Sequence, residues 1–276
     1  MGRQQRTVFY LSDRTGITAE TLGHSLLTQF DGIEWKVINV PFLDDIDKAE
    51  TVLAQINQAI ACDGHRPMVF STLLNPEILA VIKQANCCIF DFFETFIRSI
   101  EKELQQPFVR VAGRSHGLQH HLSYFKRIAA INYVLAHDDG VNPKNFTEAD
   151  IVLIGVSRCG KTPTCLYLGL QYGIAAANYP LTQEDMSALN LPRVLEKVRN
   201  KLFGLTLNPS QLHFIRQERH PNSEYASLLQ CQQEILWQES LFRMFNIPYL
   251  DTTRISIEEI SATILDRCGL KRQLYG

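Results

Sequence analysis

The sequence predicts an α/β protein with two parallel-sheet domains, 1–145 and 146–276. Two observations support this fold class. Short apolar runs alternate with amphipathic stretches over the first hundred residues, and the same alternation resumes after residue 150. Between them, residues 105–145 break the rhythm and end in the turn-rich sequence DDGVNPKN. Strands that alternate with helices form mainly parallel sheets covered on both faces, so we expect one such sheet on each side of the break.

In the first domain we expect four strands, each followed by a helix. The strands are short apolar runs, and the helices show an apolar period close to 3.6 residues. Thr18 is the expected N-cap of the first helix, and Asn75-Pro76-Glu77 starts another with a cap, a proline and an acid. The strands are expected at 7–13, 35–42, 67–73 and 87–93. Two of the helices are expected at 18–30 and 44–60, a third starts at residue 75, and a fourth follows the last strand and ends at residue 104.

The second domain is expected to follow a helix at 124–137 in the connecting region. Its strands are expected at 150–156, 174–181 and 247–253. Helices are expected at 161–173, from Asn208-Pro209, at 224–246, and after the capping box that starts at Ser256. No internal repeat is visible in the sequence.

Composition excludes several classes of protein. The 276 residues are 45% hydrophobic and 20% charged, which is typical of a globular domain. A net charge of −2 provides no overall positive field for nucleic acid or anionic lipid. No apolar segment is long enough to span a bilayer or to form a signal peptide. The seven cysteines include no CxxC pair, which favours a reducing cytoplasm over a disulfide framework or a zinc site.

A phosphate-binding motif directly follows the expected strand at 150–156. Gly155, Gly160, Lys161 and Thr162 satisfy the pattern G-x-x-x-x-G-K-[ST]. Glycines let such a loop turn its backbone N–H groups towards phosphate oxygens, and the next helix adds the positive end of its dipole. The lysine contributes a full charge, and the threonine hydroxyl can bind Mg²⁺. Pro163 is tolerated because the first turn of a helix has no acceptors for its N–H groups.

A second magnesium-binding carboxylate should follow an apolar segment. Four aspartates meet this condition, and each is also explained by a turn or a helix cap: Asp91, Asp138, Asp139 and Asp251. The motif does not identify the reaction, and the chain lacks the N-K-x-D signature of GTPases.

Beyond the motif, the chain resembles the regulatory proteins of phosphoenolpyruvate synthase, which are relatives of the pyruvate, phosphate dikinase regulatory proteins. GVSRCGKTPT and YLGLQYGIAAANYPL carry the resemblance in the second domain. FYLSDRTGITAETLGHSLLTQF, RSHGL, RIAAINYVLAHDDG, LFGLT, IRQER and SIEEI extend it over nearly the whole chain.

The resemblance implies a bifunctional enzyme whose second domain is a P-loop kinase domain. Such proteins phosphorylate a threonine beside the catalytic histidine of the synthase, with ADP as donor, and so inactivate it. They reactivate it by phosphorolysis, in which inorganic phosphate accepts the group and pyrophosphate leaves. Gly160 favours the synthase as target, because dikinase regulators usually carry serine there.

The implied site has three parts. The first is the loop that holds the ADP diphosphate: Gly155, Val156, Ser157, Arg158, Cys159, Gly160, Lys161 and Thr162, with Thr162 also helping to hold Mg²⁺. The second is a base, either Asp138 or Asp139, with Asp185 as another choice. The third is a set of phosphate or partner contacts: Ser12, Asp13, Thr15, His116, Arg216 and Arg219. Capping, a solvated basic face or an uninvolved surface histidine explains the members of this third set nearly as well.

Three alternatives stay open on the residues alone. The first is a regulator of the dikinase that uses the same chemistry. The second is a P-loop kinase of small molecules, although a long α/β segment ahead of the loop suits a protein partner better. The third is a nucleotide sensor without catalysis. A homodimer would also suit a protein that acts on a large partner.

Overall fold

The computed structural model describes residues 4–110, 121–140, 143–187 and 190–271. The chain divides into two compact units, 1–117 and 118–276. Each unit is an α/β structure with one four-stranded parallel sheet. The parallel α/β class agrees with the prediction for both units, but only three of the four strands were expected in the second. The helix at 121–136 belongs to the second compact unit. The boundary that we expected from the sequence lies further along the chain, near residue 145.

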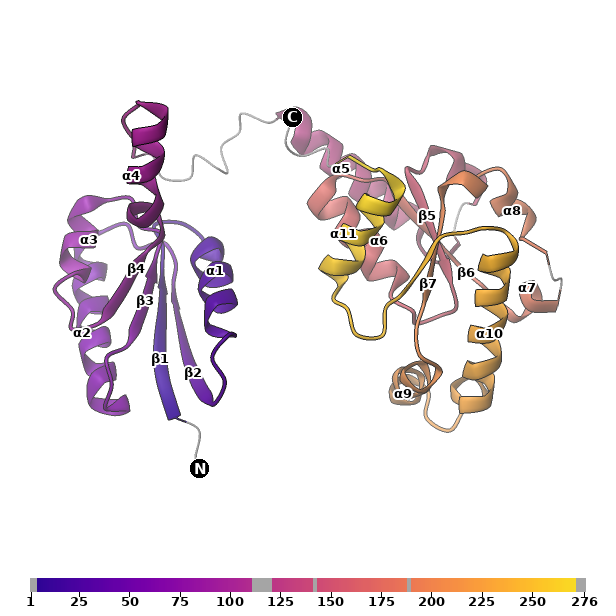
Figure 1. Ribbon diagram of the computed structural model, residues 1–276, viewed down its shortest axis with the longest axis horizontal. Helices are drawn as coiled ribbons and strands as arrows, with labels where there is room; N and C mark the ends of the chain where they lie inside the picture. The colour runs from indigo at the N-terminus through magenta and orange to yellow at the C-terminus, as the bar shows by residue number, and fades with distance from the viewer. Residues whose placement is uncertain (1–3, 111–120, 141–142, 188–189, 272–276) are drawn as a thin grey trace. The chain divides into compact units, whose positions relative to one another are not determined.

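The first unit alternates strands and helices without exception (Figure 1). Its sheet has the order β2-β1-β3-β4, and every neighbouring pair is parallel. The elements are β1 (Gln4–Leu11), α1 (Ile17–Leu27), β2 (Ile33–Val40), α2 (Ile46–Asp63), β3 (Met68–Ser71), α3 (Pro76–Ile82), β4 (Cys88–Asp91) and α4 (Phe92–Leu104).

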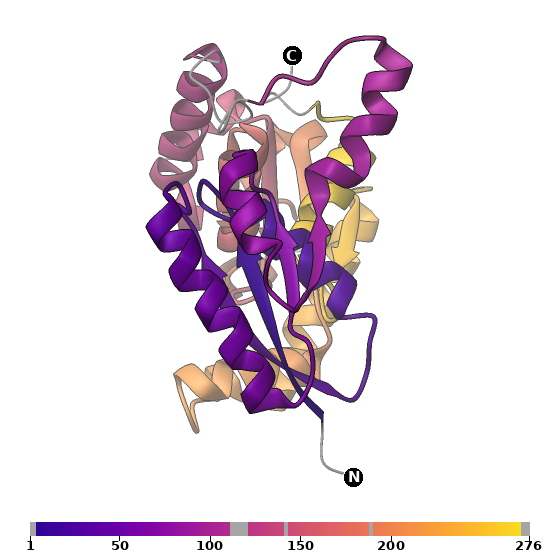
Figure 2. The ribbon, with the colours of Figure 1, turned by 90° about the vertical axis from the view of Figure 1, so that its left-hand side faces the viewer.

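Helices cover both faces of this sheet. Helices α2 and α3 pack on the face that carries Phe9 and Leu11, which Figure 2 shows from the helix side. Helix α1 packs on the opposite face, against Tyr10 and Phe70. Alternate side chains of β1 point to opposite faces, so the central strand is buried on both sides.

The N-cap of α1 lies two residues earlier than expected. Gly16 is its N-cap, with φ 81° and ψ −5°, and Thr18 lies inside the helix rather than at its cap. The left-handed conformation favours glycine. The prediction for Thr18 was therefore wrong because a glycine, rather than a hydroxyl side chain, ends the preceding loop.

The second unit repeats the same strand order, β6-β5-β7-β8, again with every neighbouring pair parallel. Its longer elements are α5 (His121–Ala136), β5 (Ile151–Gly155), α6 (Lys161–Tyr172), β6 (Ala176–Pro180), β7 (Leu202–Thr206), α9 (Pro209–Arg219), α10 (Leu228–Met244), β8 (Tyr249–Asp251) and α11 (Ile257–Cys268). Two short helices, α7 (Gln183–Ser187) and α8 (Arg193–Glu196), lie between β6 and β7.

Side chains of α5, α6 and α11 form the core on one face of the second sheet. Side chains of α8 and the later part of α10 form it on the other face. The chain crosses from one side of β5 to the other between β6 and β7, so the strand order reverses between β5 and β7. Ligands of open α/β sheets bind at such a reversal, at the carboxyl ends of the strands. No helix in the described part of the chain is long and apolar enough to cross a membrane.

Gly23 sets how closely α1 approaches the first sheet, and this gives a stability test. A Cβ atom at this position would lie 2.4 Å from Cε1 of Tyr10 and 2.9 Å from Cδ2 of Phe70. We expect Gly23→Val to lower the free energy of unfolding by about 3 kcal/mol, because both buried rings must shift. Urea unfolding measures this. His24→Val on the exposed face of α1 is the control, and equal losses for both variants would contradict the packing argument.

Candidate functional site

The loop between β5 and α6 lies at the carboxyl edge of the second sheet, where the strand order reverses. Gly155 ends β5 so close to β7 that a Cβ atom there would lie 2.5 Å from the Leu205 carbonyl oxygen. Gly160 is the N-cap of α6, with φ 90° and ψ 10°, and no side chain caps this helix. The first N–H groups of α6 are therefore left for water or for an anionic ligand.

Lys161 is buried at the start of α6, with 5% of its surface exposed. Its Nζ atom donates a hydrogen bond of 2.9 Å to the Val156 carbonyl oxygen and lies 3.9 Å from Sγ of Cys159. The lysine thus bends back across its own loop. A buried ammonium group is a strong partner for phosphate, because little water competes for it.

The next residue, Thr162, joins a cluster of three polar side chains. Its hydroxyl donates to Oδ1 of Asp138 at 2.8 Å, and Nδ2 of Asn178 lies 3.2 Å from the same hydroxyl. Nδ2 of Asn178 also donates to Oδ1 of Asp138. Asp138 belongs to the turn after α5, and Asn178 lies on β6. Three distant segments therefore meet at Thr162.

This geometry separates Asp138 from the other candidate carboxylates. Asp139 has its backbone N–H bonded to Oδ1 of Asn178 at 3.0 Å, which fixes the turn. Asp185 accepts hydrogen bonds from the Thr182 N–H and hydroxyl and from the Tyr179 hydroxyl, so its carboxylate organises the start of α7. Burial, followed by the charge of Asp185, raises the pKa of Tyr179 to about 12.

The remaining two aspartates act in local structure. Asp91 caps α4 through the Glu94 N–H, in the first unit. Asp251 accepts a hydrogen bond of 2.9 Å from the Thr253 N–H after β8. Within the second unit, Asp251 makes no hydrogen bond to the loop between β5 and α6 in the described structure.

Arg216 and Arg219 lie on α9, but they do not form one outward-facing clamp. Arg216 is 1% exposed, and its Nη2 pairs with Oε2 of Glu234 at 2.6 Å. The same Nη2 donates to the Ser157 carbonyl oxygen at 3.2 Å, so this arginine holds the loop from the protein side. Arg219 is exposed.

Arg219 instead lines a cavity of about 410 Å³ beside the loop. The cavity brings together three nitrogen-rich side chains and no carboxylate, and its lining residues are Ser157, Arg158, Arg219, His220, Ser223 and Tyr225. Arg158 adopts φ 78°, a left-handed conformation that is uncommon outside glycine. This cavity favours anions next to the loop.

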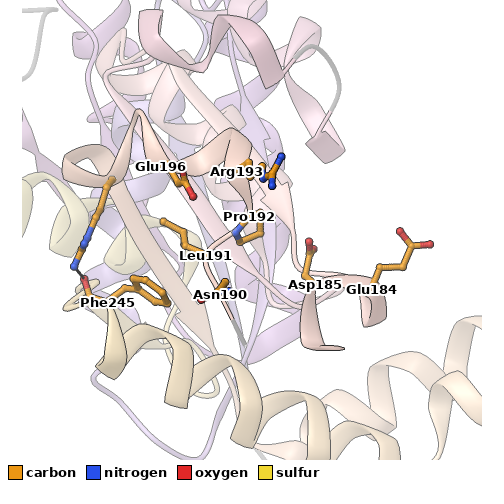
Figure 3. A pocket seen from close by; sticks show the side chains of 9 residues that line it. Glu184, Asp185, Asn190, Leu191, Pro192, Arg193, Glu196 and Phe245 are labelled. Carbon is orange, nitrogen blue, oxygen red and sulfur yellow. Dashed lines mark hydrogen bonds between the residues drawn. The ribbon is translucent and has the colours of Figure 1, made fainter. Parts of the chain in front are cut away.

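Another cavity of the second unit, about 810 Å³, is lined by no residue of the loop (Figure 3). Its lining carries both signs of charge, from Glu184, Asp185 and Glu196 and from Arg193 and Arg199. Its mixed charge gives it no preference for an anion.

The candidate residues of the first unit lie at the carboxyl end of β1. Oγ of Ser12 accepts from the Arg14 N–H at 3.1 Å, and Oδ2 of Asp13 accepts from the Leu74 N–H at 3.3 Å. Asp13 and Arg14 line a cavity of about 440 Å³, while Thr15 is exposed. His116 lies outside the described residues.

Two properties of the loop bear on cofactors. Cys159 is buried, and burial raises the pKa of its thiol, which keeps the thiol protonated and poorly reactive. Among the described residues, no group of three or more histidine, cysteine, aspartate or glutamate side chains could hold a metal ion. A dedicated transition-metal centre is therefore not built into that part of the chain.

Sequence reasoning missed three residues of this region: Asn178, Glu234 and Gln238. All three are buried and polar in otherwise apolar surroundings. Gln238 bonds the Val156 N–H at 2.9 Å through Oε1. For Asn178, a single polar residue inside the apolar run IAAANYPL was the available signal, because buried polar groups need partners. Glu234 and Gln238 lie among other polar residues of α10, so no such signal marks them.

A glycine-bounded loop at a strand-order reversal, with a buried lysine and a hydroxyl–carboxylate cluster, is typical of the phosphotransfer class of protein. The model of the Kinase/pyrophosphorylase family matches residues 8–265, and the chain belongs to that family. Membership implies an enzyme of phosphotransfer.

Individual relatives within the family share one more specific name. A putative phosphoenolpyruvate synthase regulatory protein of Nitrosomonas europaea is 58% identical over 272 residues, 99% of either chain. Proteins of the same name from Legionella pneumophila and Pseudomonas aeruginosa are each 50% identical, over 270 and 271 residues. These alignments cover 98% of this chain and at least 99% of the relatives. The resemblance noted in the sequence is thereby confirmed.

Asn178 allows a test of the cluster around Thr162. We expect Asn178→Leu to lower the free energy of unfolding by about 1–3 kcal/mol, because the Asp139 N–H and Asp138 lose buried partners. Urea unfolding measures the loss. Asn200→Leu, at an exposed position, is the control. If both variants unfold at the same urea concentration, the cluster contributes nothing to stability.

Proposed function

We propose that this protein is a bifunctional regulator of phosphoenolpyruvate synthase. It transfers a phosphoryl group from ADP to a threonine of the synthase beside its catalytic histidine, which inactivates the synthase. It also removes that group by phosphorolysis, with inorganic phosphate as acceptor. The family name combines a kinase with a pyrophosphorylase, and the names of the relatives given above include phosphoenolpyruvate synthase. Both support the proposal.

The proposal rests mainly on one observation. Lys161 and Thr162 begin α6, and Asp138 is hydrogen-bonded to Thr162 at the same helix end. Lys161 provides the charge that stabilises a phosphoryl group in transfer. Thr162 and Asp138 share a hydrogen bond of 2.8 Å, which brings a carboxylate to the same point. A carboxylate there suits two roles: it supports a Mg²⁺ site together with Thr162, and it can accept the proton of the target hydroxyl.

The loop from Gly155 to Thr162 is proposed to bind the diphosphate of ADP as a P-loop. Its glycines and the uncapped start of α6 direct backbone donors at the ligand. Lys161 must then exchange the Val156 carbonyl for phosphate oxygens. This exchange replaces a neutral acceptor with a charged one and is favourable.

The residues present fit a magnesium ion that arrives with the nucleotide. Hydroxyl and carboxylate oxygens are the ligands that Mg²⁺ prefers, and kinase sites use only one or two protein ligands plus phosphate oxygens. Thr162, held by Asp138, would supply the protein ligand. When bound, the ion neutralises charge on the phosphate oxygens.

In the kinase direction, the hydroxyl oxygen of the target threonine attacks the β-phosphorus of ADP. The bond between that phosphorus and the oxygen bridging to the α-phosphate breaks, and AMP leaves. Asp138 accepts the hydroxyl proton. Its Oδ1 is occupied by Thr162 and Asn178, and Oδ2 has no protein hydrogen bond in the described structure.

In the reverse direction, an oxygen of inorganic phosphate attacks the phosphorus of phosphothreonine. The bond from phosphorus to the threonine oxygen breaks, pyrophosphate forms, and the threonine oxygen regains a proton from Asp138. The cavity of Arg158, Arg219 and His220 beside the loop is proposed to hold the second anion, either inorganic phosphate or the phosphorylated segment of the target.

The first unit is proposed to recognise the protein partner. Its cavity at Asp13 and Arg14 lies at the strand-order reversal between β1 and β3, where sheets of this kind bind ligands. A homodimer stays a prediction.

The decisive experiment incubates the purified protein with phosphoenolpyruvate synthase and labelled ADP or ATP. We expect threonine phosphorylation with ADP, and release of pyrophosphate after inorganic phosphate is added. Lys161→Ala should slow both directions by about a hundredfold or more, because transition-state charge is no longer neutralised. Asp138→Asn should also slow both by about a hundredfold, because the base is lost.

Lys197→Ala, an exposed lysine of the same unit, is the matched control and should leave both rates unchanged. Phosphorylation with ATP alone would overturn the assignment of the donor. Transfer to a small molecule without any protein would favour a metabolite kinase. If the protein phosphorylates pyruvate, phosphate dikinase faster than the synthase, then the dikinase is its target. The protein would be a sensor if the unaltered form shows no turnover and Lys161→Ala lowers only its affinity for the ligand.

A further inference from the structure

We infer that a buried polar stripe on α10 holds the loop between β5 and α6 in its ligand-binding shape, with Gln238 and Glu234 as positioning residues and Arg216 as the link from Glu234 to the loop. The inference rests on the proposed function of this loop. None of the three residues is assigned a contact with ADP or with the reacting atoms.

Gln238 fixes the beginning of the loop. It is fully buried, and its Oε1 accepts the Val156 N–H at 2.9 Å. Its Nε2 donates to the Thr206 hydroxyl at 3.0 Å, and that hydroxyl donates to Oε1 of Glu239 at 2.9 Å. The amide therefore ties the loop to the end of β7. Both polar ends of Gln238 are used, so its orientation is fixed.

Arg216 fixes the middle of the loop. Its Nη2 donates to the Ser157 carbonyl oxygen at 3.2 Å, and its Nη1 donates to the Tyr225 carbonyl oxygen at 3.0 Å. The guanidinium group also lies 4.0 Å from the centre of the Tyr225 ring. Glu234 holds the guanidinium at 2.6 Å, and the other oxygen of Glu234 accepts from Gln230 at 2.9 Å.

These contacts act on consecutive parts of one backbone. Gln238 holds the peptide that enters Val156, and Arg216 holds the peptide that leaves Ser157. Arg158 comes next, and its left-handed conformation with φ 78° is strained for a residue with a side chain. Such a conformation persists only where its surroundings over-determine it. The network on α10 supplies that constraint.

Stability alone does not account for the buried ion pair. Taking two charges out of water is expensive, and apolar residues of similar size often replace such a pair without loss. Gln230, Glu234 and Gln238 recur every four residues, which places them on one face of α10. That face meets the loop. A role in setting the geometry of the loop explains why these buried polar side chains lie on that face of α10.

The first experiment separates positioning from stability. Arg216→Met and Glu234→Leu each leave one buried group unpaired, so each should lower the melting temperature. The double variant removes both charges and should recover the melting temperature of the unaltered protein. We nevertheless expect its affinity for ADP to fall by about tenfold, since the loss of one hydrogen bond corresponds to roughly that factor.

Hydrogen exchange of the backbone amides at 156–161, without any ligand, gives a readout that does not depend on activity. It should be faster in the stable double variant than in the unaltered protein. The matched control replaces the exposed pair of Lys83 and Glu94 in the first unit by Met and Leu, and should change neither measurement. A double variant with unaltered exchange and unaltered ADP affinity would show that the pair is only structural.

Gln238→Met tests the second contact, with Gln232→Met on the exposed face of α10 as its control. Faster exchange of the Val156 amide and weaker ADP binding are expected for the first variant only. Equal behaviour of the two would overturn the role of Gln238. If the unaltered protein does not bind ADP, the proposed function fails, and the exchange data alone then decide whether α10 positions the loop.

Discussion

The contact between the carboxyl end of β5 and its neighbour β7 governs the arrangement of the second unit. Gly155 brings the chain so close to the Leu205 carbonyl oxygen that no side chain fits between them. The loop that follows therefore lies over β7, within reach of Gln238 and Arg216. The same approach starts α6 at the strand-order reversal, so that Thr162 reaches Asp138 and Asn178. A larger residue at 155 would push these groups apart together.

Both units use the same strand order, although the sequence shows no repeat. In each, a glycine in the left-handed conformation is the N-cap of the helix that follows the first strand, Gly16 in one and Gly160 in the other. The units differ in what surrounds that glycine. The second adds a buried lysine and a carboxylate cluster, and only there do the described residues combine the parts of a phosphotransfer site.

Local patterns predicted the elements whose signals are contiguous. The strand β5, the loop and α6 follow from an apolar run, paired glycines and an amphipathic helix. The strand β7 was missed because Gly204 interrupts its short apolar run. That glycine is needed for packing, since a Cβ atom there would lie 2.6 Å from the Phe242 ring. A spacing of three residues places Arg216 and Arg219 on one face of α9. Arg216 is buried and Arg219 is exposed, because Arg216 pairs with Glu234, which belongs to another helix. Likewise, the choice of Asp138 among four aspartates depends on Asn178, forty residues further along.

The bond between Lys161 and the Val156 carbonyl has a consequence for discrimination between anions. The Val156 carbonyl oxygen lies 2.9 Å from the ammonium nitrogen of Lys161. Under the proposed function, a phosphate oxygen would have to replace this carbonyl oxygen and would also meet the nearby carboxylate of Asp138. A polyphosphate that engages the backbone N–H groups at the same time would gain more from this exchange than a monovalent ion such as chloride. The internal hydrogen bond of Lys161 would then favour polyphosphates over monovalent ions.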